Sequence, residues 1–314
     1  MAREFPNPQR LPPWLKVKLT GDGQYYDIRK RLGRLALNTV CEEARCPNMS
    51  ECWGGGTATF MILGAVCTRG CRFCDVTSGK PPAPPDLDEP RHLAEAVQAM
   101  GLRYAVITSV DRDDLPDGGA GHFVAVVEAV KQRTPKVTVE LLTPDFQGID
   151  WQIERVGRSG ATVLAHNVET VASLQRAVRD RRCSYDLSLG TLSRYRALDP
   201  RLVVKSSIML GFGETPAEVV QTLRDLRSAG ADWVTLGQYL RPSRKHAPVK
   251  HFVPPEQFDD YARAAREIGF PIVSAGPLVR SSYRAGEQHA EALVAERAAA
   301  LEALLQAATA PLRA

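Results

Sequence analysis

The sequence predicts an α/β fold built on an open, partial barrel of parallel strands. Short apolar segments that have the composition of buried strands alternate with longer amphipathic segments between residues 57 and 275. Strands that alternate with helices pair in parallel, because each helix returns the chain across the sheet by a right-handed crossover. About six such units follow one another, which is fewer than the eight of a closed (β/α) barrel.

The elements follow from hydrophobic periodicity and from the turn residues between segments. Strands are predicted at 57–66, 104–110, 137–142, 162–165, 202–210, 233–238 and 271–274. Helices are predicted at 88–100, 120–132, 151–158, 168–178, 216–228 and 255–268. A Pro-rich linker at 80–85 cannot be helical, and an Ala-rich helix is predicted at 285–308.

Three parts of the chain are expected to differ in role. Residues 1–56 form an N-terminal extension, with a helix within 25–37, and this segment wraps on the main domain because it cannot fold alone as a compact unit. Residues 57–275 form the partial barrel. Residues 276–314 form a C-terminal segment.

Composition excludes some classes of function. The chain has 314 residues, of which 44% are hydrophobic, so it can bury a large core. Its net charge of +4 is small, which argues against a nucleic-acid partner and is compatible with an acidic protein partner. Residues 1–10 lack the apolar core of a signal peptide, and no stretch has the apolar length needed to cross a bilayer. We therefore expect a cytoplasmic protein with neither nucleic acid nor membrane as partner.

Six of the seven cysteines lie between residues 41 and 74, in two groups of three. The first group has the spacing C-x4-C-x5-C and the second C-x3-C-x2-C. The two groups consist of Cys41, Cys46 and Cys52, and of Cys67, Cys71 and Cys74. Three thiolates leave one ligand position open, as in catalytic metal sites and unlike closed structural ones. Cys183 lies far along the chain from both groups and is predicted to be a structural thiol.

The second group favours an iron–sulfur cluster held by a single loop. Gly70 can relax the backbone between the ligands, and Phe73 could shield a cluster from water. Zinc is the alternative, but a zinc site usually needs a second Cys or His pair at matching distance, and none follows. Disulfides are an alternative for the first group, and the odd number of cysteines without a secretory segment disfavours them.

The run CTRGCRFC at 67–74 resembles the signature of the radical S-adenosylmethionine superfamily. The run TVCEEARCPN at 39–48 matches the auxiliary-cluster motif of the lipoyl synthase family. Further runs typical of that family are PPWLK at 12–16, GTATF at 56–60, TSVDRDDL at 108–115, GQYL at 237–240 and RSSYRA at 280–285. The resemblance therefore covers nearly the whole chain. The chain departs from the family pattern at Ala65, Ala165 and Ser207.

The resemblance implies a six-unit partial barrel of the radical S-adenosylmethionine type and the activity of a sulfurtransferase. Family members insert two sulfur atoms at the sixth and eighth carbons of an octanoyl chain on a protein lysine. The second cysteine group holds one 4Fe–4S cluster, whose open iron binds S-adenosylmethionine. The first group holds a second 4Fe–4S cluster, which is the sulfur source. A serine of the RSSY run also ligates this auxiliary cluster, and the matching position is Ser282, with Ser281 as the alternative.

Contacts to S-adenosylmethionine are expected at the carboxyl ends of the strands, where parallel α/β folds place their active sites. The candidates are Thr68, Phe73, Gly118, Gly119, Glu140, Asn167 and Lys205. Lys205 lies in an otherwise apolar strand, where an unpaired cation is costly to bury, so a ligand or a carboxylate partner is expected. Polar residues also occur at strand ends because loops start there, and Ser281 and Ser282 also suit an ordinary turn.

The resemblance also implies the partners. These are octanoylated lipoyl-carrier domains (E2 subunits of 2-oxoacid dehydrogenases and the glycine cleavage H protein), an electron donor such as ferredoxin or flavodoxin, and iron–sulfur carrier proteins. Residues 242–248 are expected to form part of the docking surface. Two alternatives are a methylthiotransferase, which would carry a separate RNA-binding module, and a non-enzymatic metal-binding protein, which would need closed four-ligand sites.

Overall fold

The computed structural model describes residues 11–16, 38–39, 48, 52, 56–283, 285–287 and 290–309. The helix predicted within 25–37, and with it Cys41 and Cys46, lies outside the described residues. Among the described helices, none is long and apolar enough to pass through a bilayer.

An eight-stranded sheet forms the centre of the molecule, with the strand order β1-β2-β5-β6-β7-β8-β9-β10. Seven of these strands are parallel: β2 (Thr57–Ile62), β5 (Tyr104–Ser109), β6 (Thr138–Leu142), β7 (Val163–Ala165), β8 (Val203–Leu210), β9 (Trp233–Gln238) and β10 (Ile272–Gly276). β1 (Asn38–Thr39) pairs antiparallel with β2 at one edge. Because β10 is the opposite edge, the barrel is open, as predicted.

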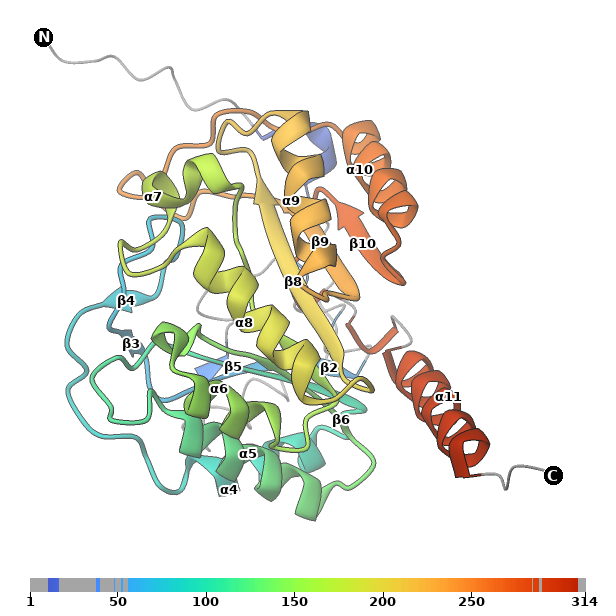
Figure 1. The fold of residues 1–314 in the computed structure, drawn as a ribbon. Helices are drawn as coiled ribbons and strands as arrows, with labels where there is room; N and C mark the ends of the chain where they lie inside the picture. The colour runs from blue at the N-terminus through green and yellow to red at the C-terminus, as the bar shows by residue number, and fades with distance from the viewer. Residues whose placement is uncertain are drawn as a thin grey trace, which may run out of the picture.

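Six helices connect the parallel strands and form the outer layer (Figure 1). They are α4 (Glu89–Ala99), α5 (Ala120–Arg133), α6 (Asp150–Gly157), α8 (Tyr185–Leu198), α9 (Pro216–Ser228) and α10 (Pro255–Ile268). Shorter elements are η1 (Pro13–Leu15), β3 (Val66–Cys67), β4 (Thr77–Ser78), η2 (Phe146–Gly148), η3 (Ala172–Leu174), α7 (Gln175–Val178) and η4 (Ala285–Glu287). α11 (Ala290–Thr309) projects from the barrel (Figure 1). The six predicted strand–helix units are thus confirmed.

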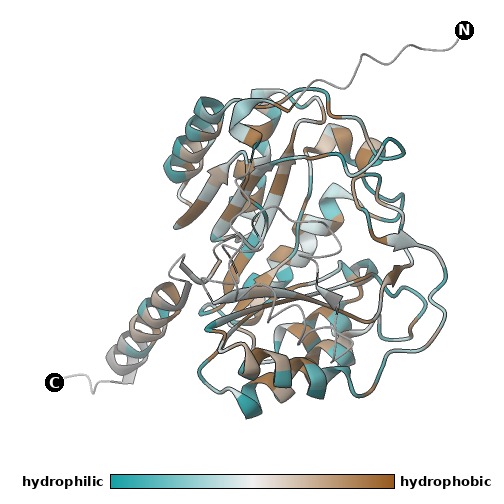
Figure 2. Ribbon diagram, turned by 180° about the vertical axis from the view of Figure 1, so that it is seen from behind, coloured by the Kyte–Doolittle hydropathy of each residue, from teal (hydrophilic) through white to brown (hydrophobic). Residues whose placement is uncertain are grey.

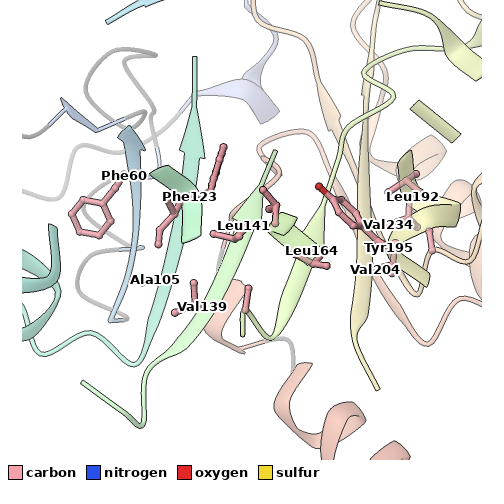
Figure 3. Close-up of a cluster of buried hydrophobic side chains, with 14 of the residues drawn as sticks. Phe60, Ala105, Phe123, Val139, Leu141, Leu164, Leu192, Tyr195, Val204 and Val234 are labelled. Carbon is pink, nitrogen blue, oxygen red and sulfur yellow. The ribbon is translucent and has the colours of Figure 1, made fainter. Parts of the chain in front are cut away.

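The main apolar core lies between the sheet and the outer helices. Alternate strand residues such as Phe60, Leu141 and Val234 point outward and pack against Phe123 of α5 and Tyr195 of α8 (Figure 3). Figure 2 shows the corresponding pattern, in which the hydrophobic residues lie mainly in the strands and on the parts of the helices that face the sheet. Because both faces of the sheet are buried, the strand sequences are nearly continuous runs of apolar residues.

The inner face of the sheet is more polar than the outer face. Thr59, Glu140, Lys205 and Thr235 occupy inward positions on their strands, and all are at most 5% exposed. At the amino ends of the strands, a small apolar cluster that includes Trp233 joins the sheet to the C-terminal segment. The lumen of the barrel is therefore closed at this end and carries polar groups above it.

The C-terminal segment 276–287 contacts strands from both sides of the barrel opening. Arg280 Nη1 donates to the backbone oxygen of Gln238 at 3.2 Å, at the end of β9. Thr59 Oγ1 in β2 donates to Ser282 Oγ at 2.8 Å. The segment thereby bridges the two sides of the opening that the hydrogen-bonded sheet leaves.

Three predicted elements need correction. The first strand ends at Ile62 rather than at 66, because Leu63 and Gly64 take the left-handed φ values of 70° and 93°. The helix predicted at 168–178 is broken, because Glu169, at φ 66°, forms a parallel bridge with Ile208, and helix resumes only in η3 and α7. α8 is not among the predicted helices. It begins where Ser184 Oγ accepts from the backbone N–H of Leu187.

Candidate functional site

Three cysteines lie on one loop at the carboxyl end of the sheet, residues 67–74, which we call the thiol loop. The turn that leads into it is fixed at Leu63, whose N–H donates to Glu89 Oε2 at 2.9 Å and whose carbonyl accepts from Arg112 at 3.2 Å. His122 Nε2 lies 2.6 Å from the same Glu89 oxygen. Side chains from α4, α5 and the end of β5 therefore hold a strained, non-glycine backbone in place.

The three thiols of the loop are half-buried, and backbone N–H groups point at two of them. Cys67 Sγ accepts from the N–H of Arg69 at 3.4 Å and of Asp111 at 3.3 Å. Cys71 Sγ accepts from the N–H of Asp180 at 3.3 Å. Hydrogen bonds of this kind stabilise thiolates and tune the potential of iron–sulfur clusters.

The surroundings of the three thiols raise their pKa values. Burial and the nearby Asp111 carboxylate raise the pKa of Cys67 to about 12, and burial also raises the pKa of Cys74. A hydrogen bond that the Cys71 thiol donates to the Cys183 sulfur is the main cause that raises the pKa of Cys71. Binding of a metal cluster must therefore release protons from this loop.

The donor set of the loop suits an iron–sulfur cluster. Among the described residues, no group of three His, Cys, Asp or Glu side chains lies close enough together to hold a single metal ion. A cubane instead needs its thiolates on separate irons, which one loop can supply. Beside the loop, Ser109 Oγ is buried without a hydrogen bond, so the strand end offers an unsatisfied polar atom to a ligand.

Arg69 of the thiol loop is held by three carboxylates. Its guanidinium binds Asp113 with two bonds of 2.9 Å and Asp145 with bonds of 2.8 and 2.7 Å, and its Nε lies 3.3 Å from Asp111. Arg69 is 3% exposed and Asp145 fully buried. Because bidentate pairs fix direction as well as distance, this Arg69 clamp pins the loop to the ends of β5 and β6.

A second set of contacts pins the loop from the side of residues 180–183. The Asp180 carboxylate accepts from the N–H of Gly70 at 2.8 Å and pairs with Arg182 at 2.9 Å. Arg69 Nη1 donates to Cys183 Sγ at 3.4 Å. Cys183, which lies far along the chain from both cysteine groups, is next to Cys71 in space, and the bond from Cys71 lowers its pKa to about 7.

Glu140 and Lys205 form an ion pair inside the barrel. Lys205 Nζ donates to the two carboxylate oxygens at 2.8 and 2.9 Å, and the Tyr104 hydroxyl donates to Glu140 at 2.7 Å. The ammonium also lies 3.6 Å from the centre of the Trp233 ring. The expected carboxylate partner of Lys205 is thus confirmed. A contact of either residue with S-adenosylmethionine stays a prediction.

Thr68 and Phe73 connect the thiol loop to its surroundings. Thr68 Oγ1 donates to the Asp111 carbonyl at 3.0 Å, and Phe73 packs against a small apolar cluster that includes Val178 and Tyr239. These contacts support the shielding role predicted for Phe73, and its contact with the cofactor stays a prediction, as does that of Thr68.

Gly118 and Gly119 are required by the backbone and by packing. They have φ values of 58° and 86°, and a Cβ on Gly119 would lie 2.4 Å from the Leu63 side chain. Gly119 also precedes the first residue of α5. Their predicted contact with the cofactor is not tested by this arrangement.

Asn167 and Glu169 lie together beyond the end of β7. Asn167 Nδ2 donates to Glu169 Oε1 at 3.1 Å, and both side chains are half-buried. Burial raises the pKa of Glu169, and the charge of its carboxylate helps to raise the pKa of the Cys74 thiol. Glu169 is missing from the predicted set, although its strained φ of 66° marks it in the structure.

The first cysteine group is described only at Cys52, which is half-buried and packs against the main core. Asn48, in the same segment, donates from Nδ2 to the Leu278 carbonyl at 2.7 Å. Ser282 is half-buried beside Thr59 on the inner face of β2. The structure therefore brings the segment of the first group and the C-terminal segment into contact. Ligation by Cys41, Cys46, Cys52 and Ser282 stays a prediction.

Comparisons with known proteins agree with this geometry. The radical SAM superfamily model matches residues 61–226, and the model of the N-terminal domain of lipoyl synthase matches residues 1–46. The lipoyl synthase of Anaeromyxobacter sp. is 54% identical over 88% of this chain and 94% of its own. The mitochondrial lipoyl synthase of Phytophthora infestans is 53% identical over 88% of this chain and 74% of its own.

A solved structure shares the fold. The FeFe-hydrogenase maturase HydG from Carboxydothermus hydrogenoformans superposes with a TM-score of 0.56 and 14% identity, over 87% of this chain and 60% of its own.

The relatives also correct one expectation. The predicted cytoplasmic location is wrong, because the Phytophthora infestans relative, which is 53% identical to this chain, is named mitochondrial.

Proposed function

The chain belongs to the lipoyl synthase family of radical S-adenosylmethionine enzymes, and from this membership we propose how its own residues serve the reaction. The reaction inserts two sulfur atoms into an octanoyl chain that a carrier protein presents on a lysine. The chain is therefore a sulfur-transferring enzyme.

Cys67, Cys71 and Cys74 hold the 4Fe–4S cluster that the superfamily implies. When bound, this cluster and S-adenosylmethionine supply the one-electron chemistry that removes hydrogen from an unactivated carbon. The N–H groups of Arg69, Asp111 and Asp180 stabilise the thiolates, and the Arg69 clamp fixes their direction. The packing around Phe73 keeps water from the outer side of the loop.

A second, auxiliary cluster is held by Cys41, Cys46, Cys52 and Ser282. The contact between Asn48 and Leu278 and the bond between Thr59 and Ser282 support this assignment, because Asn48 lies four positions before Cys52 and Leu278 lies in the C-terminal segment that carries Ser282. A serine oxygen binds iron less well than a thiolate does, so it makes one corner of the cluster easy to release. That property suits a cluster from which sulfur is taken.

The carboxyl ends of the strands hold S-adenosylmethionine. Asn167 is the best supported contact with S-adenosylmethionine. Its half-buried amide binds the Glu169 carboxylate, and that carboxylate is close enough to Cys74 to raise the pKa of the thiol. Glu140 and Lys205 neutralise each other on the inner face of the sheet. Thr68, Phe73, Gly118, Gly119, Glu140 and Lys205 complete the proposed set. We assign residues 1–56 and 276–314 to the auxiliary cluster and 57–275 to the catalytic barrel.

The substrates are octanoylated lipoyl-carrier proteins, of which the E2 subunits of 2-oxoacid dehydrogenases and the glycine cleavage H protein are the proposed members. Ferredoxin or flavodoxin is proposed as electron donor, and iron–sulfur carrier proteins as the source of new clusters. A single observation carries the function: three thiols on one loop, two of which receive backbone N–H bonds, at the carboxyl end of an open barrel.

The test is an anaerobic assay of the reconstituted protein with dithionite, S-adenosylmethionine and an octanoyl-lysyl peptide. We expect 5′-deoxyadenosine, then a singly thiolated peptide and finally a lipoylated peptide by mass spectrometry. Cys52→Ala should still form 5′-deoxyadenosine but insert no sulfur. If the wild-type protein forms 5′-deoxyadenosine without inserting sulfur into any octanoylated substrate, the proposed reaction is wrong.

A further inference from the structure

Six exposed cationic side chains surround the outer side of the thiol loop. We call them the cationic rim: Arg72, Arg176, Arg241, Arg244, Lys245 and Lys250. They come from the thiol loop itself, from α7 and from the loop between β9 and α10. The sequence does not reveal the rim, because its members lie in three separate stretches of the chain.

Backbone hydrogen bonds join these three stretches into one surface. The N–H of Arg72 donates to the Val178 carbonyl, and the Arg72 carbonyl accepts from the N–H of Ala247, both at 2.8 Å. His246 Nε2 lies 3.0 Å from the Cys74 carbonyl. In Figure 1, α7 lies beside the loop that runs from β9 to α10, near β3 and β4. The rim is therefore attached directly to the backbone between two of the cluster ligands.

A shared apolar cluster supports the rim from below. Val178 of α7, Tyr239 and Ala247 pack together with Phe73 of the thiol loop. The Tyr239 ring stacks on Phe212 with 4.3 Å between the ring centres, and the Tyr239 hydroxyl donates to the Ala247 carbonyl at 2.9 Å. The backbone segments that carry the cations thus pack against one apolar cluster, which fixes these segments relative to the cluster ligands.

The charges of the rim are not neutralised by neighbouring carboxylates. Among the described residues, none of its six side chains forms an ion pair, and Arg72 and Arg241 bind only backbone carbonyls, at 3.2 and 3.0 Å. Elsewhere on the surface, Arg91, Arg201 and Arg263 each pair with a carboxylate within three positions along the chain. Cations without an ion-pair partner therefore gather in the three adjoining stretches that carry the rim.

We propose that the cationic rim docks an acidic face of the carrier domain that presents the octanoyl-lysine, a proposal that rests on the function given above. An octanoylated lysine side chain is about 15 Å long when extended, so the carrier must bind within that distance of the cluster. The rim is the charged surface at that place. Complementary charge speeds the encounter and sets the orientation of the carrier, while the acyl chain supplies the contacts inside the barrel.

The test compares two substrates of the dithionite-reduced holoenzyme: a complete octanoylated carrier domain and a neutral octanoyl-lysyl tripeptide. In the variant R241E/R244E/K245E we expect the KM for the carrier domain to rise by about tenfold or more, with kcat little changed. The KM and kcat for the tripeptide should stay those of the wild type, because its acyl chain does not need the rim. For the wild type alone, the KM for the carrier should rise steeply with ionic strength.

A matched control carries the same change of charge away from the rim. R158E/R224E/R266E alters three exposed arginines at the end of α6 and on α9 and α10. This variant should keep the wild-type KM for both substrates. An equal rise of KM in both triple variants would overturn the proposal, because it would reflect net charge rather than the rim.

Three other outcomes would overturn the docking proposal. If the rim variant keeps the wild-type KM for the carrier, the proposal is wrong. If the variant is slowed only when a protein donor replaces dithionite, the rim docks the electron donor and the carrier proposal is overturned. Failure of the wild type to lipoylate either substrate would instead overturn the function itself, and the docking proposal with it.

Discussion

The two ends of the barrel hold buried charge in opposite ways. At the carboxyl ends of the strands, one buried guanidinium, that of Arg69, is surrounded by three carboxylates. At the amino ends, one buried carboxylate, that of Asp232, is surrounded by Arg196, Arg227 and Arg297. Arg69 is 3% exposed and Asp232 1% exposed, so both central charges depend on their partners.

The difference lies in what each cluster holds. The Arg69 clamp fixes a loop that carries the three predicted cluster ligands, and its carboxylates come from the strand ends that surround the site. The Asp232 cluster fixes α11, whose Arg297 binds the carboxylate at 2.9 Å, and the amino end of β8, where the N–H of Val204 donates at 3.0 Å. The same interaction therefore positions chemistry at one end and supports the fold at the other.

The largest expected effect comes from removing a ligand at the carboxyl end. Cys71→Ala should lower the formation of 5′-deoxyadenosine by about a thousandfold or more, because the cluster loses one of its three predicted thiolate ligands. Cys183→Ala is the matched control, since Cys183 lies beside Cys71 but is not a predicted ligand. We expect it to keep most of its iron and activity. If both variants lose cluster and activity equally, the distinction between ligand and neighbour is wrong.

Breaking the Arg69 clamp should come next. Arg69→Met leaves three buried or half-buried carboxylates without their cation, and we expect the free energy of unfolding to fall by about 3–5 kcal/mol. The variant should also lose iron to a chelator faster, because the loop is no longer pinned. Arg182→Met, whose side chain is 39% exposed, is the control and should cost about 1 kcal/mol or less. Equal losses in a denaturant titration would contradict the assigned role of the clamp.

The carboxyl end should also respond to acid through His166. Burial and the nearby Arg179 lower the pKa of His166 from 6.5 to about 4. Between these values the unfolded chain binds a proton that the folded chain does not, so stability falls as pH falls through this range. The full effect at pH 4 is about 3 kcal/mol. In His166→Gln, the loss of stability between pH 7 and pH 4 should be smaller than in the wild type. An unchanged pH profile would show that His166 does not titrate as described.

At the amino end, Asp232→Asn should cost about 2 kcal/mol of stability, because the half-exposed arginines can partly return to water. The formation of 5′-deoxyadenosine per folded molecule should stay at the wild-type level. A loss of activity at constant folded fraction would show that the two ends are not separate in function.

The sequence predicted the parts of the site that depend on local spacing. The thiol loop was found because its cysteines lie within eight residues, and the six strand–helix units because each element carries its own periodicity. The need of Lys205 for a partner also follows from one apolar strand. Its partner Glu140 lies 65 positions away, and the acids that bind Arg69 lie up to 76 positions away, so spacing could not identify them.

The elements that were mispredicted are those set by tertiary contacts. The helix expected at 168–178 is interrupted where Glu169 bridges to Ile208, which overrides the local preference for helix. α8 was missed because Ser188, Gly190 and Thr191 interrupt its apolar face, although Ser184 is a typical N-cap residue. The cationic rim is likewise invisible until the barrel brings three distant stretches together.

The most direct test concerns the origin of the inserted sulfur. The protein would be reconstituted with heavy-isotope sulfide, freed of excess sulfide, and allowed a single turnover on an octanoyl-lysyl peptide. We predict two heavy sulfur atoms in the lipoylated product of the wild type, and none in Cys52→Ala, which should still form 5′-deoxyadenosine. Light sulfur in the product, taken from unlabelled sulfide added at the start of turnover, would contradict the proposal that the auxiliary cluster is the donor.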